Sequence, residues 1–184
     1  MKNNEILWAK IRPEAVIPTK RDEDAGFDLY ACFYEDYLVI NSGETKFIGL
    51  GVASAFPENY VVFLKERGST AKYGLSIRSG VIDSGYRGEY VLAITNVGNQ
   101  SVVIYNTQWY SHDEDNGLIM TDKDGELIKH VQFQYPSLFY PASKAICQAV
   151  LLPLPKLQSR EVSYEELTEI KSERGTGLMG SSGK

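Results

Sequence analysis

Short hydrophobic runs separated by polar turns fill most of the chain. Each run is rich in β-branched and aromatic residues, as strands are. We therefore expect strands at residues 6–11, 37–40, 46–50, 60–64, 90–95, 102–105 and 146–152, with turns at 41–43, 57–59 and 97–99. Regular short strands of this kind predict a mainly β protein, a sandwich or a barrel, with little helix.

Residues 106–140 interrupt the strand pattern. They are rich in Asp, Glu, Lys, Gly and aromatic residues, and Asp122-Lys123-Asp124-Gly125 is typical of a turn. We expect an insertion that forms a small extra hairpin. Its acidic run 113–115 is able to hold a cation, but a solvated acidic loop is the interpretation we favour.

The last part of the chain has a different character. Residues 163–170 fit either a short helix, with Ser163 as its N-cap, or an acidic linker. Residues 172–184 are rich in Gly and Ser, which predicts either disorder or a mobile arm that closes on phosphates. We place one domain at 1–160, and a linker with its mobile arm at 161–184.

The composition limits the chemistry. The chain has 184 residues, enough for one domain, and a formal net charge of −5, without the basic excess of a nucleic-acid-binding protein. Only two cysteines and two histidines occur, so a disulfide scaffold, a His-rich metal site and a Ser-His-Asp triad are poorly supported. We expect a reducing, cytoplasmic compartment. No signal peptide or membrane span is visible in the sequence, so we expect no membrane partner.

The run Gly80-Val81-Ile82-Asp83-Ser84-Gly85-Tyr86-Arg87-Gly88-Glu89-Tyr90 carries the strongest chemical signal. Apolar residues on both sides predict a strand, a turn and a second strand. The turn is expected to hold Asp83 and Tyr86 close together above a pocket. Such a pair suits a base that activates water beside a ring that packs on a sugar or another flat ligand. An Asp that merely closes a hairpin has the same pattern.

Five segments, in this order, resemble motifs of the trimeric dUTPase family. They are Asp24-Ala25-Gly26-Phe27-Asp28-Leu29, Glu66-Arg67-Gly68-Ser69-Thr70-Ala71-Lys72-Tyr73-Gly74-Leu75, the run 80–88, Ile146-Cys147-Gln148, and the arm 174–183. Together they span nearly the whole chain outside the insertion, and the ordered set is specific. The resemblance implies a distorted β-barrel or jelly-roll subunit in a homotrimer, with each active site drawing on three subunits.

The resemblance also implies a reaction. Members of the family hydrolyse dUTP to dUMP and pyrophosphate with Mg²⁺. Asp83 matches the residue that orients and deprotonates the water attacking the α-phosphorus. Asp28 matches a position near the Mg²⁺–triphosphate unit, which it contacts through water. Tyr86 matches the ring that packs against deoxyribose, where a 2′-hydroxyl would clash.

The remaining expected contacts are to the base and the phosphates. Backbone groups near Gly80 and Val91 read the uracil edge. Arg67 braces the site near Asp83 or the phosphates, and Arg174 acts like an arginine finger as the arm closes. The full nucleotide-binding set, in which Ser69, Gln148 and the hydroxyls of the arm contact phosphates, is Arg67, Gly68, Ser69, Gly80, Ile82, Tyr86, Val91, Gln148, Arg174, Gly177, Met179, Gly180, Ser181 and Ser182.

The chain departs from the family pattern in three places. Gly68 separates Arg67 from Ser69, where the family usually has Ser directly after Arg. Ser143-Lys144-Ala145 replaces the usual Gly-Asp-Arg before the glutamine. Leu178-Met179 replaces the usual Gly-Phe, whose ring stacks on uracil in the family. We expect weaker base coverage or a relaxed base preference from this last change.

Other functions stay open. A dCTP deaminase shares the fold, but its glutamate general acid/base corresponds to Ala93 here, and Glu89 lies too early on the strand. The altered arm also allows a broader dNTP pyrophosphatase. A regulatory, partner-binding protein on this fold is a different class. Its contact surface would be the aromatic residues of the insertion, for which burial is the commoner explanation, namely Trp109, Tyr110, Phe133, Tyr135, Phe139 and Tyr140.

Overall fold

The computed structural model describes residues 5–106, 110–113, 115–173 and 175–176. Contacts between residues divide the chain into two units, Met1–Leu154 and Pro155–Lys184. The two units are described separately below. The domain boundary expected between residues 160 and 161 stays a prediction.

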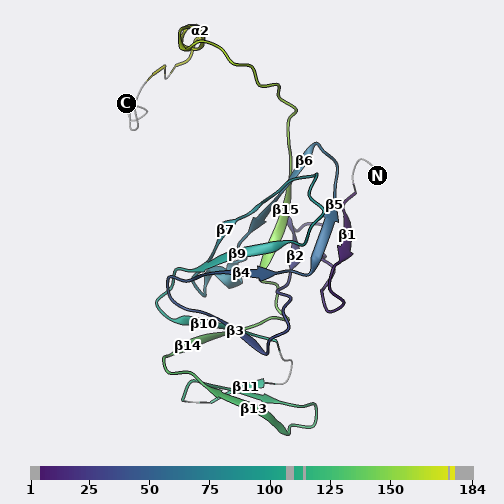
Figure 1. The fold of residues 1–184 in the computed structure, drawn as a ribbon, viewed down its shortest axis with the longest axis vertical. Coiled ribbons are helices and arrows are strands. Elements are labelled where there is room, and N and C mark those ends of the chain that lie inside the picture. The colour runs from purple at the N-terminus through teal and green to yellow at the C-terminus, as the bar shows by residue number, and fades with distance from the viewer. Residues whose placement is uncertain (1–4, 107–109, 114, 174, 177–184) are drawn as a thin grey trace. The chain divides into compact units, whose positions relative to one another are not determined.

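Strands dominate the described part of the first unit (Figure 1). Its described residues contain a single helix, the one-turn α1 (Gly68–Ala71). The strands, in chain order, are β1 (Leu7–Lys10), β2 (Gly26–Leu29), β3 (Tyr37–Ile40), β4 (Thr45–Gly49), β5 (Val52–Ala55), β6 (Tyr60–Lys65), β7 (Leu75–Ser79), β8 (Val81–Ile82), β9 (Val91–Asn96), β10 (Ser101–Tyr105), β11 (Tyr110–His112), β12 (Gly117–Thr121), β13 (Leu127–Gln132), β14 (Ser137–Pro141) and β15 (Cys147–Pro153). The expected mainly β fold with little helix is confirmed.

The described strands form five small sheets rather than one closed barrel. Their orders are β1-β5, β14-β10-β3, β11-β12-β13, β2-β15-β6-β8 and β4-β9-β7. All pairs are antiparallel except β10 with β14, which run parallel from Ser101↔Ser137 to Tyr105↔Pro141. Since most neighbours in these sheets are distant in sequence, the fold brings separate motifs to common edges.

The seven predicted strands all appear within one residue of their expected limits. The hydrophobic pattern missed the strands whose composition is weak. β2 contains Gly26 and Asp28, and β5 reads Val-Ala-Ser-Ala. These segments are strands because a hydrogen-bonding neighbour is present, a contribution that local β-propensity does not include.

The main core lies between these sheets. It is built from fully buried aliphatic and aromatic side chains, and every one of the main sheets outside the insertion contributes to it. Its largest members include Phe56, Tyr90 and Tyr140, each at most 1% exposed. Tyr90 keeps its hydroxyl paired with Ser54 Oγ at 2.6 Å, which satisfies a polar group in the interior.

The insertion is a three-stranded sheet, β11-β12-β13, where a two-stranded hairpin was expected. The turn predicted at 122–125 joins β12 to β13, with Gly125 at φ 86°. In Figure 1 the sheet lies beyond β10, β3 and β14. A second core joins the two sheets and contains Val103, Tyr105, Leu118 and Met120, with Tyr37, Val39, Val131, Phe133 and Phe139 packed against it.

The aromatic residues of the insertion therefore divide. Phe133 and Phe139 pack in the second core, and Tyr140 belongs to β14 and is fully buried in the main core. Tyr135 is 67% exposed. Trp109 lies outside the described residues. Tyr110 is 40% exposed. Packing thus accounts for three of the six aromatic residues, because the inserted sheet needs an apolar face to hold it on the body of the protein.

The second unit contains α2 (Tyr164–Glu169), which confirms the helix over the linker interpretation. Ser163 is its N-cap, and its Oγ accepts a hydrogen bond from the Glu166 N–H at 3.0 Å. Glu165 and Glu166 stand in the first turn, where a carboxylate is favoured by the helix dipole. None of the helical residues is buried.

Candidate functional site

The turn between β8 and β9 carries Asp83 and Tyr86. The Tyr86 N–H donates to the Asp83 carbonyl at 3.0 Å, which closes the turn and leaves the Asp83 carboxylate exposed to solvent. A pocket of about 180 Å³ opens beside it, lined by Val81, Ile82, Asp83, Tyr86, Glu89 and Val91. The turn thus presents a carboxylate, an aromatic ring and apolar walls to one concave surface, as the sequence predicted.

The Tyr86 ring is held against the end of its own turn. Its hydroxyl donates to the Glu89 carbonyl at 2.9 Å. Gly88 allows this position, because a Cβ there would lie 2.6 Å from Tyr86 Cζ and still closer to Tyr86 Oη. Tyr86 is 44% exposed, so its other side is available to a ligand.

Glu89 anchors the end of this turn through its carboxylate. Its Oε2 accepts from Arg12 Nη2 at 3.1 Å, and its Oε1 accepts from the Gly51 N–H at 2.9 Å. Arg12 also donates through Nη1 to the Cys32 carbonyl at 2.9 Å. A Cβ at Gly49 would lie 2.5 Å from Glu89 Oε1 and 2.8 Å from Arg12 Nη2, so a side chain there would displace the ends of this ion pair. The carboxylate of Glu89 is therefore engaged with the protein.

A second pocket lies where β6 leads into α1 and where β15 begins. It has a volume of about 380 Å³ and is lined by Arg67, Gly68, Ser69, Lys144 and Gln148. Arg67 is the N-cap of α1, with its N–H and carbonyl bonded to the Thr70 hydroxyl at 3.0 and 2.9 Å. This local capping fixes where the first turn of α1 and its backbone N–H groups lie.

Asp28 and Gln148 come to the same place through sheet pairing. They are opposite each other in the β2-β15 ladder. Arg67 Nε forms an ion pair with Asp28 Oδ1 at 3.0 Å, and Gln148 Nε2 donates to the Glu66 carbonyl at 3.0 Å. Asp28 and Arg67 are each 31% exposed, so the pair borders solvent.

Tyr140 lies beside the second pocket, next to its lining residue Ser69. Its hydroxyl donates to the Ala145 carbonyl at 2.7 Å and lies 3.4 Å from Ser69 Oγ. Burial raises the pKa of Tyr140, so the phenol stays neutral and serves as a structural donor. It links Ser69, on α1, to the turn that precedes β15.

The two pockets share no lining residue. The first contains Asp83, Ile82, Tyr86 and Val91, and the second contains Arg67, Gly68, Ser69 and Gln148. Arg67 pairs with Asp28 and not with Asp83. The Gly80 carbonyl accepts from the Leu64 N–H at 2.7 Å, so it is used in strand pairing. The expected residues of the arm, Arg174, Gly177, Met179, Gly180, Ser181 and Ser182, lie outside the described residues.

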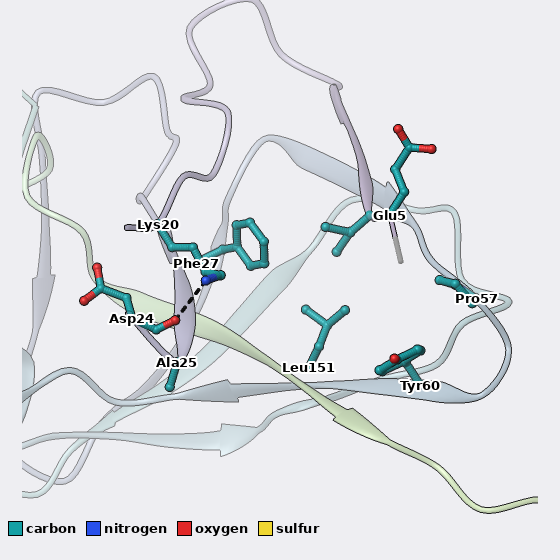
Figure 2. Close-up of a pocket in the computed structure, with 9 residues that line it drawn as sticks. Glu5, Lys20, Asp24, Ala25, Phe27, Pro57, Tyr60 and Leu151 are labelled. Atoms are coloured by element: carbon teal, nitrogen blue, oxygen red, sulfur yellow. Dashed lines mark hydrogen bonds between the residues drawn. The ribbon is translucent and has the colours of Figure 1, made fainter. Parts of the chain in front are cut away.

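A further pocket lies beside β1, β2, β6 and β15 (Figure 2). It is lined mainly by apolar residues, among them Phe27, Tyr60 and Leu151. Lys20 extends across its edge and donates to the Asp24 carbonyl at 3.0 Å, the dashed line in Figure 2. None of the expected catalytic or nucleotide-binding residues lines it.

The acidic run of the insertion holds no metal site in the described residues. Asp113 instead accepts from the Gly117 N–H and pairs with His130 Nε2 at 2.7 Å. Across the described parts of the chain, no cluster of three or more His, Cys, Asp or Glu side chains suits a metal ion. Within the same residues, neither helix has the length and hydrophobicity of a membrane span.

Comparison with known proteins decides the family. The dUTPase family model matches residues 12–108, more than half of the chain. This chain is a member of the dUTPase family. The match includes both pockets except for Lys144 and Gln148, so it covers the turn with Asp83 and the Arg67 segment together.

Curated relatives of this dUTPase family member include cellular and viral proteins. Deoxyuridine 5′-triphosphate nucleotidohydrolase of Nautilia profundicola is 31% identical over 179 residues, which cover 95% of this chain and 96% of that protein. The Pol polyprotein of equine infectious anemia virus is 37% identical over 110 residues, which cover 56% of this chain. The match spans only 9% of that polyprotein.

The fold also matches that of a solved dUTPase. The dUTPase of Staphylococcus bacteriophage 80alpha, solved with dUpNHpp, superimposes with a TM-score of 0.69 at 25% identity. The alignment covers 98% of this chain and 99% of the phage chain. The dUTPase-like fold expected from the five motifs is confirmed.

The deaminase alternative finds no support in the geometry. Ala93 is 2% exposed and pairs with Phe47 in the β4-β9 ladder, so that position offers no carboxylate. Glu89 does line the Asp83 pocket, but its carboxylate is bound by Arg12 and by the Gly51 N–H. Neither residue is placed to move a proton at a pyrimidine ring.

Lys144 lines the Arg67 pocket and Glu89 lines the Asp83 pocket, although neither was among the expected site residues. Lys144 stands in the segment where the sequence departs from the family motif, which was the available signal. Glu89 was considered only for deamination. Its role as an anchor depends on Arg12, which is 77 residues away in the chain and has no motif of its own.

Proposed function

We propose that this protein hydrolyses dUTP to dUMP and pyrophosphate, with Asp83 as the general base. The observation that carries the proposal is the turn that sets the exposed Asp83 carboxylate beside the Tyr86 ring in one pocket. The carboxylate takes a proton from water as the water oxygen bonds to the α-phosphorus. The bond from that phosphorus to the bridging oxygen breaks, and pyrophosphate leaves.

Selectivity for the deoxynucleoside rests on the same turn. The Tyr86 ring packs on the deoxyribose, where a 2′-hydroxyl would clash, and the neighbouring backbone reads the uracil edge. This ring is anchored to the Glu89 carbonyl, so it cannot swing aside without breaking a hydrogen bond. A fixed ring discriminates better than a mobile one, because the clash is then not relieved by side-chain rotation.

The phosphates are expected in the second pocket, with Arg67, Ser69 and Gln148. Mg²⁺ enters as part of the substrate, bound to the triphosphate. The residues present fit this mode, because Asp28 is a partly exposed carboxylate next to Arg67, and the described residues form no protein cage for a metal. Mg²⁺ usually keeps several of its bound waters. Asp28 would therefore contact the ion through one of these waters, and its negative charge would favour binding of the Mg²⁺–triphosphate.

We propose a homotrimer with shared sites, and the separation of the two pockets supports it. The Asp83 pocket is lined by no basic side chain, and the Arg67 pocket contains neither a base nor an aromatic ring for the sugar. A nucleoside triphosphate needs both sets of groups. Juxtaposition of the two pockets across a subunit interface would complete the site, and the arm with Arg174 would then close over it.

Two free, buried cysteines, Cys32 and Cys147, are in keeping with the cytoplasm as the working compartment. Burial raises the pKa of both thiols, so they stay protonated and unreactive.

A separate role in binding a protein partner through residues 106–140 remains compatible with catalysis. Exposed Tyr135, Leu127 and Ile128 on the insertion are what favour it.

The test is pyrophosphate release with Mg²⁺ from dUTP, dCTP, dTTP and UTP by the parent protein and by Asp83→Asn. We expect rapid release from dUTP, and a loss of at least about 10²-fold in the variant, because the amide cannot accept the proton. Ser84→Ala, beside it in the turn, is the matched control and should keep parental activity. Release from several nucleotides would instead indicate the broader pyrophosphatase, and release from none would contradict the proposal.

A further inference from the structure

Lys144 has an unusual position at the phosphate-side pocket. It ends the turn that connects β14 to β15, and its N–H donates to the Pro141 carbonyl at 3.0 Å. Its Nζ lies 5.5 Å from the centroid of the Tyr140 ring, within range of a cation–π contact. Tyr140 is itself fixed by its hydrogen bond to the Ala145 carbonyl. The ammonium is thus held near the pocket by a buried ring.

The charges around this pocket leave Lys144 without an acidic partner. Arg67 forms its ion pair with Asp28. Glu66, the residue before Arg67, accepts from the Ile77 N–H at 2.8 Å and pairs with Lys65. In the described residues Lys144 takes part in no ion pair. Among the side chains that line the pocket, its positive charge is the one that no carboxylate neutralises.

We propose that the Lys144 ammonium binds the polyphosphate chain of the substrate in the pocket that it shares with Arg67, Ser69 and Gln148. A polyphosphate is the ligand class that this set suits, since it combines one unneutralised cation with hydroxyl and amide donors. The first turn of α1 places Gly68 and Ser69 beside these donors. The inference extends the proposed function by naming a binding residue.

The sequence explains why a positive charge is needed at this point. The fourth motif has Ser143-Lys144-Ala145 where the dUTPase family usually has Gly-Asp-Arg, so the usual arginine is missing and an acidic position has become basic. Ala145 is buried, and its carbonyl accepts from the Tyr140 hydroxyl at 2.7 Å and from Arg67 Nη1 at 3.5 Å. A lysine supplies a compact charge on a flexible stem, which follows the phosphate rather than holding it in a fixed fork.

Binding of inorganic tripolyphosphate tests this inference independently of catalysis. Titration calorimetry compares the parent with Lys144→Ala, Lys144→Arg and the control Lys72→Ala, which removes the same charge from the exposed C-cap of α1. We expect Lys144→Ala to weaken binding about five- to tenfold, the size of one charge-assisted contact at a partly solvated site. Lys144→Arg and Lys72→Ala should bind within about twofold of the parent.

A second readout separates charge from structure. Loss of one contacting charge should make tripolyphosphate binding by Lys144→Ala less sensitive to added salt than binding by the parent. In dUTP hydrolysis, KM should rise while kcat changes little, since a uniform binding contact is lost. Equal tripolyphosphate affinity of Lys144→Ala and the parent, or absence of binding by the parent, would overturn the inference. If the parent binds tripolyphosphate in this way but does not hydrolyse dUTP, the proposed function fails and the role of Lys144 stands.

Discussion

Single residues in the turn after β8 determine whether the Tyr86 ring can stand over the pocket. The ring is anchored at its hydroxyl by the Glu89 carbonyl. It lies so close to the backbone that Gly88 has no room for a side chain. Gly85, three residues earlier, has open space around it and no left-handed backbone angle. Of these two glycines, Gly88 has a steric reason for being glycine, whereas the space and backbone angle at Gly85 require none.

Alanine substitutions at these two glycines test this difference. Gly88→Ala should displace the Tyr86 ring, lower kcat/KM for dUTP by about tenfold or more, and reduce the preference for dUTP over UTP, because positioning errors of this size are costly. Steady-state kinetics with both nucleotides measures the effect. Gly85→Ala should leave both values near those of the parent. Equal behaviour of the two variants would show that the fit of the ring is not what sets discrimination.

At the scale of elements, the insertion depends on one carboxylate at the start of its sheet. Asp113 follows β11, accepts from the Gly117 N–H at the start of β12, and pairs with His130 of β13. It thereby connects all three strands. The Gly117 N–H and His130 together hold the pKa of Asp113 below its ordinary value, although partial burial opposes them. The charged form of Asp113 is thus the form that stabilises the sheet.

The pH dependence of the inserted sheet follows from this shift. A lowered carboxyl pKa means that the stabilisation is complete above the ordinary Asp value of about 3.9, and is lost as the pH falls through the lower folded-state value. Hydrogen exchange of the amides in β12 and β13 should show protection decreasing in that acid range. Asp113→Asn should show reduced protection already at neutral pH, whereas Asp124→Asn, at the exposed tip, should match the parent. Equal protection in all three proteins would contradict the role of Asp113.

At the scale of the whole molecule, the chain presents several of the expected site residues in two separate pockets. Antiparallel pairing of β15 with β2 and β6 assembles Asp28, Arg67 and Gln148. Pairing of β8 with β6 positions the Asp83 turn at the other pocket. A face near that turn also carries large exposed apolar side chains, namely Phe47, Val81 and Val91, which are between 43% and 72% exposed. Such surfaces are typical of contacts between subunits.

Complementation between inactive variants tests whether the sites are shared. Asp83→Asn and Arg67→Ala should each be inactive alone. After unfolding and joint refolding at equal amounts, mixed trimers should recover about a quarter of the parental activity, because one site in four then takes both intact residues from different chains. Light scattering should give the mass of three chains. Absence of recovery, or a mass of one chain, would contradict the shared-site trimer.

The sequence by itself determined the family and much of the β framework. The strongly hydrophobic strands, the cap at Ser163 and the Asp83–Tyr86 turn depend on neighbours in the chain, and the pattern therefore predicted them. Tertiary structure alone decided what depends on distant partners. Strands such as β2 exist because β15 pairs with them, Arg12 reaches Glu89 across 77 positions, and the inserted sheet is held by a second core. The position of Lys144 also depends on distant partners. Its charge reaches the pocket of Arg67 only when the turn before β15 folds against α1.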